Sequence, residues 1–517
     1  MSATKDVQFT LKVMINRDKT KVLFAEADSD FTDVLLSFLT LPLGKIAKIL
    51  VEHYGDSTPA VCSLTALYNS LADLDVLHFH SETSKQMLLN PRSVFDKECR
   101  KLKLNLCDSK PTKYFTCGQA SIGEHNFSMY YDTVRCDCGK TMSTETNFIS
   151  SEAAEDGDDR AFCTKGASFI IGDDMLVAPN VAGSVLRTLA ELGVRDIKGA
   201  EMRNVTFGYN EIIDMLRGMF VSRTPLTDVI IGKAQTNSGV SIPKTNGKAH
   251  QRNSGFFTPK TEEETVSKSE KTMILKVMIQ KSTQKFMFAQ AEDDFADFLF
   301  SLLTIPLGGA LSLLGTNTGV TSLDKFYVSV ESINGDKYLT KDRTKFRKTE
   351  LPIGYMSPNQ LLPLTEGGVP ELHFVGASGL LLPELHSSPL TVTNTTPSLK
   401  RAPYANPFYS NNVTHRTSNL VRLKSPKGNG NYVKGPTMYM VTDDLSVTPL
   451  CMTSSLSILD RLGISLSDVE ELELNIGLEE ALSILKASLN STSALTNALS
   501  GPSPKKQSPK KRVKIEH

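Results

Sequence analysis

Apolar and polar residues alternate near the start of the chain, where Phe9, Leu11, Val13 and Ile15 are the apolar members. Alternation of this kind places the apolar side chains on one face of a β-strand. Polar residues 16–19 interrupt the pattern, and the largely apolar stretch VLFAEA follows them. Two such runs around a polar turn predict a β-hairpin.

The apolar spacing then changes to the three- and four-residue steps of a helix face. The residues of this face are Phe31, Val34, Leu35, Phe38 and Leu39. We expect Ser29 or Asp30 to cap the helix, because short polar side chains accept hydrogen bonds from its first amides. Pro42 is expected to end it, because proline lacks the amide hydrogen that a helix needs.

Later residues predict a second group of short elements. A strand, a tight turn and a strand fall at 170–179, a helix at 181–192, a strand at 201–207 and a last helix at 209–220. Hairpin-joined strands with short helices, without regular strand–helix–strand alternation, are typical of α+β folds. We therefore predict an α+β fold with mainly antiparallel strands and short helices.

The chain carries this pattern twice. Residues 9–44 align with residues 273–308 at a constant offset of 264, and 19 of the 36 positions are identical. Residues 170–179 align with residues 440–449 at an offset of 270. A repeat of this length predicts two homologous units.

Domain organisation follows from the repeat and from composition. Segments rich in Ser, Thr, Gly, Lys and Glu with few apolar residues are typical of flexible linkers and disordered ends. The predicted division is a first unit at 1–235 with a cysteine-containing insert at about 107–142, a flexible linker at 236–272, a second unit at 273–499 with a disordered insert at about 387–431, and a basic disordered tail at 500–517.

Composition and charge narrow the function classes. The 517 residues are 40% hydrophobic and 22% charged, which excludes collagen-like, coiled-coil and wholly disordered chains. Lysine plus arginine and aspartate plus glutamate both number 57, so no overall basic field attracts nucleic acid. Residues 500–517 carry six basic groups and one acid, so the basic character is confined to the tail.

Three cysteines gather within 22 residues, at Cys117, Cys136 and Cys138. Zn²⁺ in structural sites is held by four thiolate or imidazole ligands in a tetrahedron. The run resembles half of a zinc ribbon with one further thiol, although the Cys-x-Cys spacing is shorter than the Cys-x-x-Cys spacing usual in zinc turns. The second unit lacks these cysteines.

A fourth ligand for this group must come from elsewhere in the first unit. We place it at His125, with Cys107 and Cys163 as alternatives. Four protein ligands would leave no open position on the metal, so the predicted cofactor is a structural zinc and not a catalytic one. The competing interpretation is a small apolar cluster of thiols without metal.

Paired carboxylates occur at equivalent places in both units, as Asp173-Asp174 and Asp443-Asp444. Such pairs are candidates for metal binding or acid–base chemistry. Both lie between two apolar strand segments, where aspartate is favoured because its side chain bonds nearby backbone amides in a turn. We therefore interpret both pairs as turns.

Other candidate chemistry is weaker. His78 and His80 would share one face of an extended segment, and we interpret them as surface or hydrogen-bonded histidines. The sequence contains no complete phosphate-binding loop, dinucleotide-binding glycine pattern, nucleophile elbow or His-Glu-x-x-His motif. We assign no catalytic residue, and the enzyme question stays open with a preference for a non-enzymatic protein.

The tail ends in a basic cluster formed by Lys510, Lys511, Arg512 and Lys514. Short basic clusters are typical of nuclear import signals, so we expect an import receptor as a partner. Eight cysteines without regular pairing and a start without a secretory leader indicate an intracellular protein of the nucleus, the cytoplasm or both. We expect no membrane span.

Two Ser-Pro-Lys-Lys repeats in the tail make Ser503 and Ser508 candidate sites for proline-directed kinases. Each phosphate would add about −1.5 to −2 charges, so two would nearly cancel the net charge of the tail. Nucleic acid is not an expected partner, because few phosphate contacts give only weak, salt-sensitive binding.

Several motifs together resemble one family. They are the Lys-Val-x-Ile opening, Phe-Ala-Glu-Ala at 24–27, Phe-Ala-Gln-Ala at 288–291, the Leu-Pro-Leu-Gly and Ile-Pro-Leu-Gly segments, the Asp-Asp-x-x-Val-x-Pro stretch and the cysteine run. Over nearly its whole length, the chain is similar to the plant-specific family called domain of unknown function 674. The resemblance implies a plant protein of tandem homologous units, and it brings no established activity and no catalytic residues.

The leading functional prediction is a non-enzymatic interaction or regulatory protein. Two linked units raise the effective concentration for a partner with two sites, and this needs no catalysis. One alternative is an enzyme or small-molecule binder with a site between the two units. A second alternative is a weak nucleic-acid binder that uses the basic tail.

Overall fold

A computed structural model describes much of the two regions that align with each other in the sequence. The predicted linker, apart from its last two residues, and the predicted tail lie outside the described residues. The described residues are 6–55, 62–108, 111–118, 125–149, 160–232, 271–283, 285–333, 335–340, 346, 350–367, 372–378, 391–393 and 414–499.

Two five-stranded sheets form the framework, and all pairs within them are antiparallel. The first has the order β7-β6-β2-β1-β8, with β1 at Phe9–Ile15, β2 at Val22–Asp28, β6 at Ser168–Gly172, β7 at Val177–Pro179 and β8 at Glu201–Phe207. The second has the order β17-β16-β10-β9-β18, with β9 at Met273–Gln280, β10 at Lys285–Ala291, β16 at Tyr439–Val441, β17 at Val447–Pro449 and β18 at Val469–Ile476.

The two sheets also agree in register. Met14 pairs with Phe24 in the first sheet, and Met278 pairs with Phe288 in the second, with an irregularity in the ladder beside each pair. These positions correspond at the offset of 264 found in the sequence. The agreement supports the predicted duplication, and the α+β fold class is confirmed.

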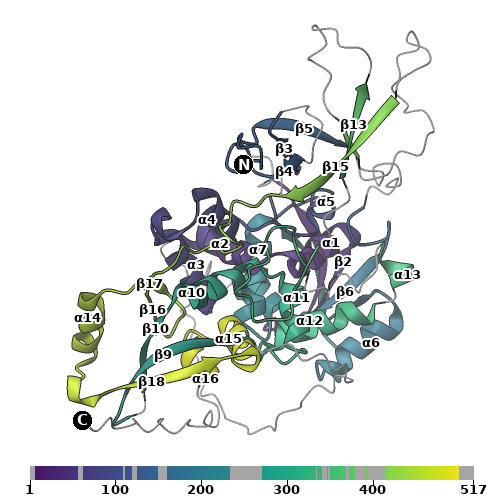
Figure 1. Cartoon of the computed structure of the whole chain (residues 1–517). Coiled ribbons are helices and arrows are strands. Elements are labelled where there is room, and N and C mark those ends of the chain that lie inside the picture. Colours follow the sequence, from purple (N-terminus) through teal and green to yellow (C-terminus); the bar gives the residue numbers. More distant parts are fainter. Residues whose placement is uncertain are drawn as a thin grey trace, which may run out of the picture.

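Helices of both units lie between the two sheets (Figure 1). In the first unit these are α1 at Ser29–Ser37, the 3-10 turn η1 at Phe38–Thr40, α2 at Leu43–Tyr54, α3 at Ser63–Asp73, α4 at Glu82–Leu89, α5 at Asp96–Cys99 and α7 at Tyr209–Val221. In the second they are α10 at Asp293–Ser301, η6 at Leu302–Thr304, α11 at Leu307–Leu313, α12 at Thr321–Ser332, α15 at Leu478–Asn490 and α16 at Ala494–Leu499. Their apolar faces and the inner faces of both sheets form one continuous core. None of the described helices combines the length and apolar character needed to cross a bilayer.

The first helix differs from the prediction at both ends. Asp28 is the cap, because its carboxylate accepts the amide of Phe31 at 2.9 Å, so neither Ser29 nor Asp30 caps the helix. Pro42 stands one residue before α2 and therefore begins the next helix. Proline suits that position because the first amides of a helix have no partner within it.

A further helix covers the outer face of each sheet. Helix α6 at Ala182–Glu191 packs Leu189 against β2 and β6, and helix α14 at Met452–Leu462 packs Ile458 and Leu459 against β10 and β16. The two helices lie at opposite sides of the molecule (Figure 1). Each sheet is thus enclosed between the central helices and one outer helix.

A third sheet contains strands from both units, in the order β3-β5-β14-β13-β15-β4. Its strands are β3 at Tyr114–Thr116, β4 at His125–Phe127, β5 at Thr144–Ile149, β13 at Leu372–Ser378, β14 at Thr391–Thr393 and β15 at Thr414–Leu423. First-unit strands β5 and β4 pair in parallel with second-unit strands β14 and β15, respectively.

This sheet includes part of the insert predicted for the second unit. We expected disorder at about 387–431, whereas β14, β15 and the loop at 424–431 are described there. Both strands contain β-branched residues, which suit a sheet, and the first unit supplies part of their pairing. The rest of this segment lies outside the described residues.

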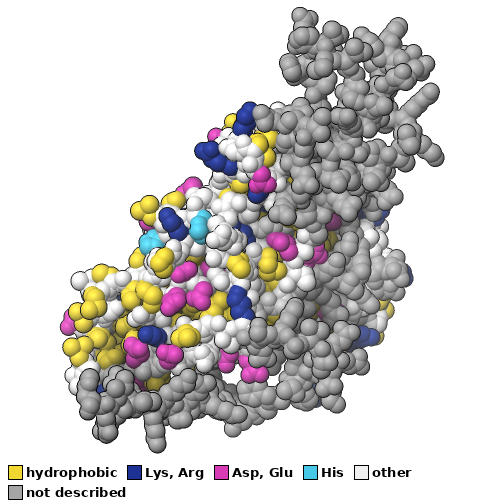
Figure 2. Space-filling view, viewed as in Figure 1, with side chains coloured by type: hydrophobic (Ala, Val, Ile, Leu, Met, Phe, Trp, Pro, Cys, Tyr) yellow, Lys and Arg dark blue, Asp and Glu magenta, His cyan; other side chains and the backbone are white. Residues whose placement is uncertain are grey.

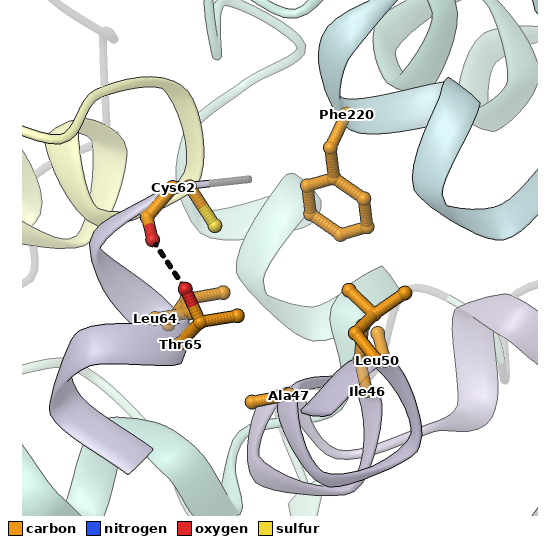
Figure 3. Close-up of a pocket in the computed structure, with 7 residues that line it drawn as sticks. All are labelled: Ile46, Ala47, Leu50, Cys62, Leu64, Thr65 and Phe220. Carbon is orange, nitrogen blue, oxygen red and sulfur yellow. Dashed lines mark hydrogen bonds between the residues drawn. The ribbon is translucent and has the colours of Figure 1, made fainter. Parts of the chain in front are cut away.

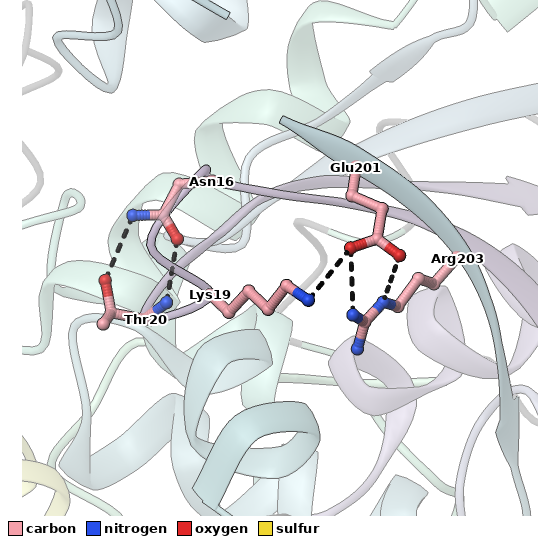
Figure 4. A network of polar contacts seen from close by, with 5 residues as sticks. All are labelled: Asn16, Lys19, Thr20, Glu201 and Arg203. Carbon is pink, nitrogen blue, oxygen red and sulfur yellow. Dashed lines mark hydrogen bonds and ion pairs between the residues drawn. The ribbon is translucent and has the colours of Figure 1, made fainter. Parts of the chain in front are cut away.

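A network of polar side chains ties the turn after β1 to the edge strand β8 (Figure 4). Asn16 accepts the amide of Thr20 at 2.9 Å. The Lys19 ammonium lies 3.5 Å from the Glu201 carboxylate, which also accepts two bonds from Arg203 at 2.9 and 3.0 Å. All five residues lie at the surface, so the network positions the turn without contributing to the core.

Candidate metal centre

The three predicted cysteine ligands converge in the first unit. Cys117 directly follows β3, whereas Cys136 and Cys138 lie in a tight loop before β5. The amide of Cys136 donates to the carbonyl of Lys140 at 2.9 Å, and the amide of Gly139 donates to the carbonyl of Cys136 at 2.8 Å. These bonds fold the loop so that both of its thiols face Cys117.

The sulfur spacing suits a tetrahedral metal. The three Sγ atoms all lie within 4.8 Å of one another. Thiolates about 2.3 Å from zinc in a tetrahedron are about 3.8 Å apart, so a shift of about 1 Å would bring these thiols into place. Gly118 and Gly139 follow Cys117 and Cys138 directly, with φ of 70° and 84°. Glycine adopts such values easily, so the backbone can turn away immediately after each thiol.

A small apolar cluster supports the group from one side. Phe115, Cys136 and Met142 are buried in it, and partly buried Cys117 packs against them. Cys138 is exposed. The site therefore lies at the surface, with a rigid apolar base and one accessible thiol.

The cysteine loop also contacts the second unit. The Asp137 carboxylate lies 2.7 Å from the ammonium of Lys424, just beyond β15. The amide of Lys424 donates to the carbonyl of Phe127 in β4 at 2.8 Å. A metal at the three thiols would thus fix a loop that borders the sheet shared by both units.

The fourth ligand is not among the described side chains. His125 belongs to β4, but its side chain lies outside the description. The alternatives lie elsewhere: the Cys107 thiol donates to Cys99 Sγ at 3.4 Å, and the Cys163 amide donates to Asp33. The bond to Cys99 and burial raise the pKa of Cys107, and burial raises that of Cys163. Both thiols thus favour the protonated form, which is a poor metal ligand.

Within the part of the chain that the structure describes, this is the one group of three or more cysteine, histidine or carboxylate ligands that come this close together. The group could hold a metal ion, as the cysteine spacing predicts. The identity of the metal and its fourth ligand stay predictions.

The paired carboxylates lie in the turns from β6 to β7 and from β16 to β17, as interpreted from the sequence. Asp173 accepts the amide and the hydroxyl of Thr227, both at 2.8 Å. Asp443 accepts the amide of Thr496 at 2.7 Å and its hydroxyl at 3.0 Å. Each turn therefore anchors the last helical segment of its own unit.

The two histidines contact the second unit. His78 Nδ1 lies 3.3 Å from the hydroxyl of Tyr439. The ring of His80 packs so closely on Gly428 that a Cβ atom there would overlap it. Both rings serve the contact between units, which agrees with the hydrogen-bonded interpretation for His78.

Two buried carboxylates were missed by the sequence reasoning. Asp33 and Asp297 correspond at an offset of 264. Asp33 accepts the amides of Phe162 at 3.2 Å and Cys163 at 2.7 Å. Asp297 accepts the amides of residues 432–433 at 2.7 and 2.9 Å. We call each arrangement a carboxylate clamp, because one buried oxygen holds two consecutive amides.

Burial shapes the electrostatics of the clamps. It raises the pKa of Asp33 to about 6, and it also raises the pKa of Asp297. The signal for these residues was present in the sequence as an aspartate at the same place in two helices, directly before the apolar pairs 34–35 and 298–299. A buried charge is costly unless it is hydrogen-bonded, so such a position indicates a bonding role.

An apolar crevice too narrow to hold a water molecule lies between α2, the start of α3 and α7 (Figure 3). It is lined by Ile46, Ala47, Leu50, Cys62, Leu64, Thr65 and Phe220. The hydroxyl of Thr65 donates to the carbonyl of Cys62 at 3.0 Å. Burial raises the pKa of Cys62 to about 12, so its thiol stays protonated. The crevice offers packing surface and no reactive group.

The tail signals cannot be compared with the structure. They lie outside the described residues, and their predicted roles stay predictions. The residues concerned are Lys510, Lys511, Arg512 and Lys514 for import, and Ser503 and Ser508 for phosphorylation.

Comparison with known proteins agrees with the motif resemblance. A family model described as Protein of unknown function (DUF674) matches residues 5–477. Searches of curated proteins and of solved structures found no match. The matched region includes both five-stranded sheets and the cysteine cluster. The plant origin of the chain stays a prediction. The chain therefore belongs to the DUF674 family of proteins of unknown function.

Proposed function

We propose that this protein is a non-enzymatic interaction protein that presents the same apolar surface at two sites. The observation that carries the proposal is the equivalence of the outer helices α6 and α14. Leu186 is 69% exposed and its counterpart Leu456 is 53% exposed. The next helical turn directs Leu189 and Leu459 inward, where each is 8% exposed. Both helices thus use one face for the sheet and leave an apolar residue on the other.

Other exposed apolar residues extend these surfaces. Met452 on α14 is 81% exposed, and Leu466 beyond its end is 69% exposed. Val181 and Ile197 flank α6 and are also exposed. Hydrophobic side chains gather at the end of the molecule where α14 lies (Figure 2). Exposed apolar clusters favour protein partners, and the exposed leucine that both outer helices share favours a partner bound twice.

The experiment compares partner capture by the full chain with capture by the Leu186→Ser, Leu456→Ser double variant. A protein that only the native chain retains is then purified and titrated by calorimetry. We expect two partner molecules per chain, one with either single variant and none with the double variant. Val328→Ser, at a half-exposed position on α12, is the matched control and should retain both sites.

The proposal is wrong if a purified partner binds the double variant as tightly as the native chain. It is also wrong if the native chain binds one molecule and neither single variant weakens it. Both outcomes are measured with the full chain, so loss of an entire unit cannot imitate them.

We further propose zinc as the metal of the cysteine cluster, with a structural role. Three thiolates within reach of one ion suit zinc. The apolar cluster beneath the loop is small, so a metal crosslink would add to the stability of the loop. The purified full chain should contain about one zinc. Cys138→Ser should remove it, whereas Cys451→Ser, which changes an exposed thiol of the second unit, should not. An intact chain without stoichiometric metal contradicts the proposal.

For the basic tail we propose nuclear import. A fluorescent fusion of the full chain should leave the nucleus when Lys511→Ala and Arg512→Ala are combined, because import receptors bind basic side chains in an extended segment. The upstream pair Lys505→Ala, Lys506→Ala tests whether the signal extends further. If nuclear fluorescence is unchanged in the first double variant, the basic cluster is not an import signal.

The alternative of a ligand site between the units receives no support from their closest contact. Residues 41–43 and 305–307 bond to each other through their backbones there. The crevice that can be described is lined entirely by first-unit residues.

A further inference from the structure

Backbone contacts between the two units are reciprocal. The amide of Leu43 donates to the carbonyl of Ile305, and the amide of Leu307 donates to the carbonyl of Leu41, both at 2.9 Å. Ile305 and Leu307 are the counterparts of Leu41 and Leu43 at the offset of 264. Each unit therefore gives the other the same bond that it receives, as in a two-fold symmetric dimer.

The glycine after each of these segments follows the same rule. A Cβ atom at Gly44 would lie 3.0 Å from the carbonyl oxygen of Leu303, and one at Gly308 would lie 3.1 Å from that of Leu39. Leu303 is the counterpart of Leu39. The Leu-Pro-Leu-Gly and Ile-Pro-Leu-Gly motifs thus share one task, which is to let two backbones approach closely.

An exchange of extended segments adds a second reciprocal contact. The amide of His80 donates to the carbonyl of Tyr432 at 3.2 Å, and the amide of Lys434 donates to the carbonyl of His78 at 2.8 Å. Between these bonds, Phe79 forms a bridge with Val433, and both side chains are buried. The first unit thereby extends a segment across to the second.

A segment of the second unit pairs with the first unit in the equivalent way. The amide of Thr340 donates to the carbonyl of Phe162 at 2.7 Å, and the amide of Thr164 donates to the carbonyl of Tyr338 at 2.9 Å. Cys163 bridges Leu339 between them. The receiving segments 162–163 and 432–433 are those held by the carboxylate clamps. Each clamp therefore fixes the backbone segment of its own unit with which the other unit pairs.

Helix contacts repeat the exchange. Helix α3 of the first unit packs against α15 and β17 of the second, whereas α12 of the second unit packs against α7 and β7 of the first. The hydroxyl of Ser63 donates to the carbonyl of Ser491, and that of Ser322 donates to the carbonyl of Ser222, both at 2.7 Å. The exchanged part of each unit thus includes a helix and an extended segment.

We infer that the surface between the units is a dimer interface whose partner is another unit of this fold, so that the two halves assemble in trans as separate polypeptides. Alone, a unit would expose the apolar face of α3 or α12 and leave its exchanged segment unpaired. Burying these apolar side chains again and pairing the exposed segment both favour association with a second unit. A lone unit therefore has a strong tendency to bind a second unit.

The connection between the units makes the intramolecular pair the preferred one. It runs from the first unit to the second through the segment 236–272, which composition predicts to be a flexible linker. A flexible connection of this kind gives an effective concentration near the millimolar range. Pairing within one chain thus prevails in dilute solution, and exchange between chains is expected at high concentration.

The test uses the full chain with a specific protease site inserted at 236–272. After cleavage, size-exclusion chromatography and native mass spectrometry should find both halves in one 1:1 complex of nearly the original mass. Two halves that separate at micromolar concentration overturn the inference, whether or not each stays folded. If the site resists cleavage, co-expression of residues 1–235 and 271–517 with a tag on one half gives the same two outcomes.

A variant and its control show whether the reciprocal contacts hold the halves together. Ser322→Ala removes one bond between the units and should weaken retention of the untagged half about fivefold, which corresponds to about 1 kcal/mol. A Cβ atom at Gly183 on α6 would have no neighbour within 4 Å, so Gly183→Ala should leave retention of the untagged half unchanged. Equal retention of the two variants contradicts the assigned interface.

Discussion

The two carboxylate clamps make the same bonds in different surroundings. Around the first clamp the neighbours are aromatic: the ring of Phe346 lies 5.9 Å from that of Phe95 and 5.2 Å from that of Phe162. Asp33 accepts the amides of residues 162–163, and Phe162 belongs to this aromatic group. Besides these amides, the Cys163 thiol hydrogen-bonds this carboxylate.

Around the second clamp the neighbours are polar. The second carboxylate oxygen of Asp297 accepts a close bond from the hydroxyl of Ser357 and a longer one, 3.4 Å, from the side-chain amide of Asn359. The ammonium of Lys427 lies 4.4 Å from the centre of the Tyr432 ring. Four donors thus surround a carboxylate whose counterpart in the first unit has two backbone donors and the neighbouring thiol of its own segment.

The difference shows which part of the arrangement the fold requires. Asn359 stands where the first unit has Phe95, and Tyr432 stands where it has Phe162, at offsets of 264 and 270. Both units keep the two amide bonds although these neighbouring residues differ. The exchange between units therefore depends on the clamp and on the close backbone approach, whereas the surroundings need only fill space and satisfy polar groups.

The largest expected effect distinguishes the two motif glycines. A Cβ atom at Gly308 would overlap the carbonyl oxygen of Phe346, whereas one at Gly44 would lie 3.0 Å from its nearest neighbours. Gly308→Ala should therefore lower the free energy of unfolding by about 3 kcal/mol or more, and Gly44→Ala by about 1–2 kcal/mol. Urea denaturation of the full chain measures both.

Gly183→Ala is the matched control for these substitutions. Its position on α6 leaves open space around a new Cβ atom, so alanine should be neutral or slightly stabilising. Equal costs for Gly44→Ala and Gly308→Ala would show that the two approaches are equally tight in solution.

The next effect tests the clamps themselves. Asp297→Ala would leave two buried amides and a hydroxyl without their acceptor, and Lys427 would lose a nearby compensating charge. Asp33→Ala would leave two amides. We expect a loss of about 3 kcal/mol for Asp297→Ala and about 2 kcal/mol for Asp33→Ala.

Asparagine at the same positions separates the bonds from the charge. Asp33→Asn and Asp297→Asn keep an oxygen that accepts the two amides, so both should retain most of the stability that alanine removes. Urea denaturation of the four variants gives the comparison. If asparagine is as harmful as alanine, the charge and not the clamp stabilises the exchanged segments.

Local patterns predicted much of the fold. The strand Glu201–Phe207 has the predicted bounds, and α6 and α7 each lie within one residue of their predicted ends. These elements follow from apolar periodicity and turn residues close by in the chain. The cysteine cluster was predictable for the same reason, since Cys117 and Cys138 are near each other in sequence.

The exchange between units was not predictable in this way. Residues 78–80 pair with a segment about 350 residues later, and nothing in a single strand pattern selects that partner over a closer one. The strands at 391–393 and 414–423 were missed because another unit supplies part of their pairing. Sequence periodicity indicates that a segment is extended, but it does not identify the neighbour.

A smaller effect concerns the pH dependence of the free energy of unfolding. Its sign for Asp33 of the first clamp is opposite to its sign for Lys427 near the second clamp. Burial raises the pKa of Asp33 from 3.8 to about 6, so the folded state binds a proton that the unfolded state has released between these values. The resulting stability is complete below about pH 4 and is lost as the pH rises through 6. Asp33→Asn should reduce this slope.

Lys427 in the second unit acts in the opposite direction. Burial lowers its pKa from 10.5 to about 8, so the folded state binds fewer protons than the unfolded state between these values. Stability should therefore rise with pH from about 8 to 10.5, and Lys427→Met should remove the rise. Denaturation midpoints across the pH range check both signs, and an acid-range slope that Asp33→Asn leaves unchanged would assign it to other carboxylates.

The smallest effect compares the hairpin turns of the two units. Asp468 accepts the amide of Ser282 at 2.9 Å, its hydroxyl at 2.6 Å and the side chain of Gln280 at 2.8 Å. Glu201 in the first unit bonds the charged side chains of Arg203 and Lys19 and no backbone amide of the turn.

Because Asp468 holds the backbone of its turn, Asp468→Ala should lower the melting temperature by about 2–3 °C, and Glu201→Ala by less than about 1 °C. High salt should abolish the effect of Glu201→Ala, since exposed ion pairs are screened, and should leave most of the effect of Asp468→Ala. Calorimetric scans at low and high salt measure both. Equal, salt-sensitive shifts would mean that the two turns are held by charge alone, and the units would then differ only around their clamps.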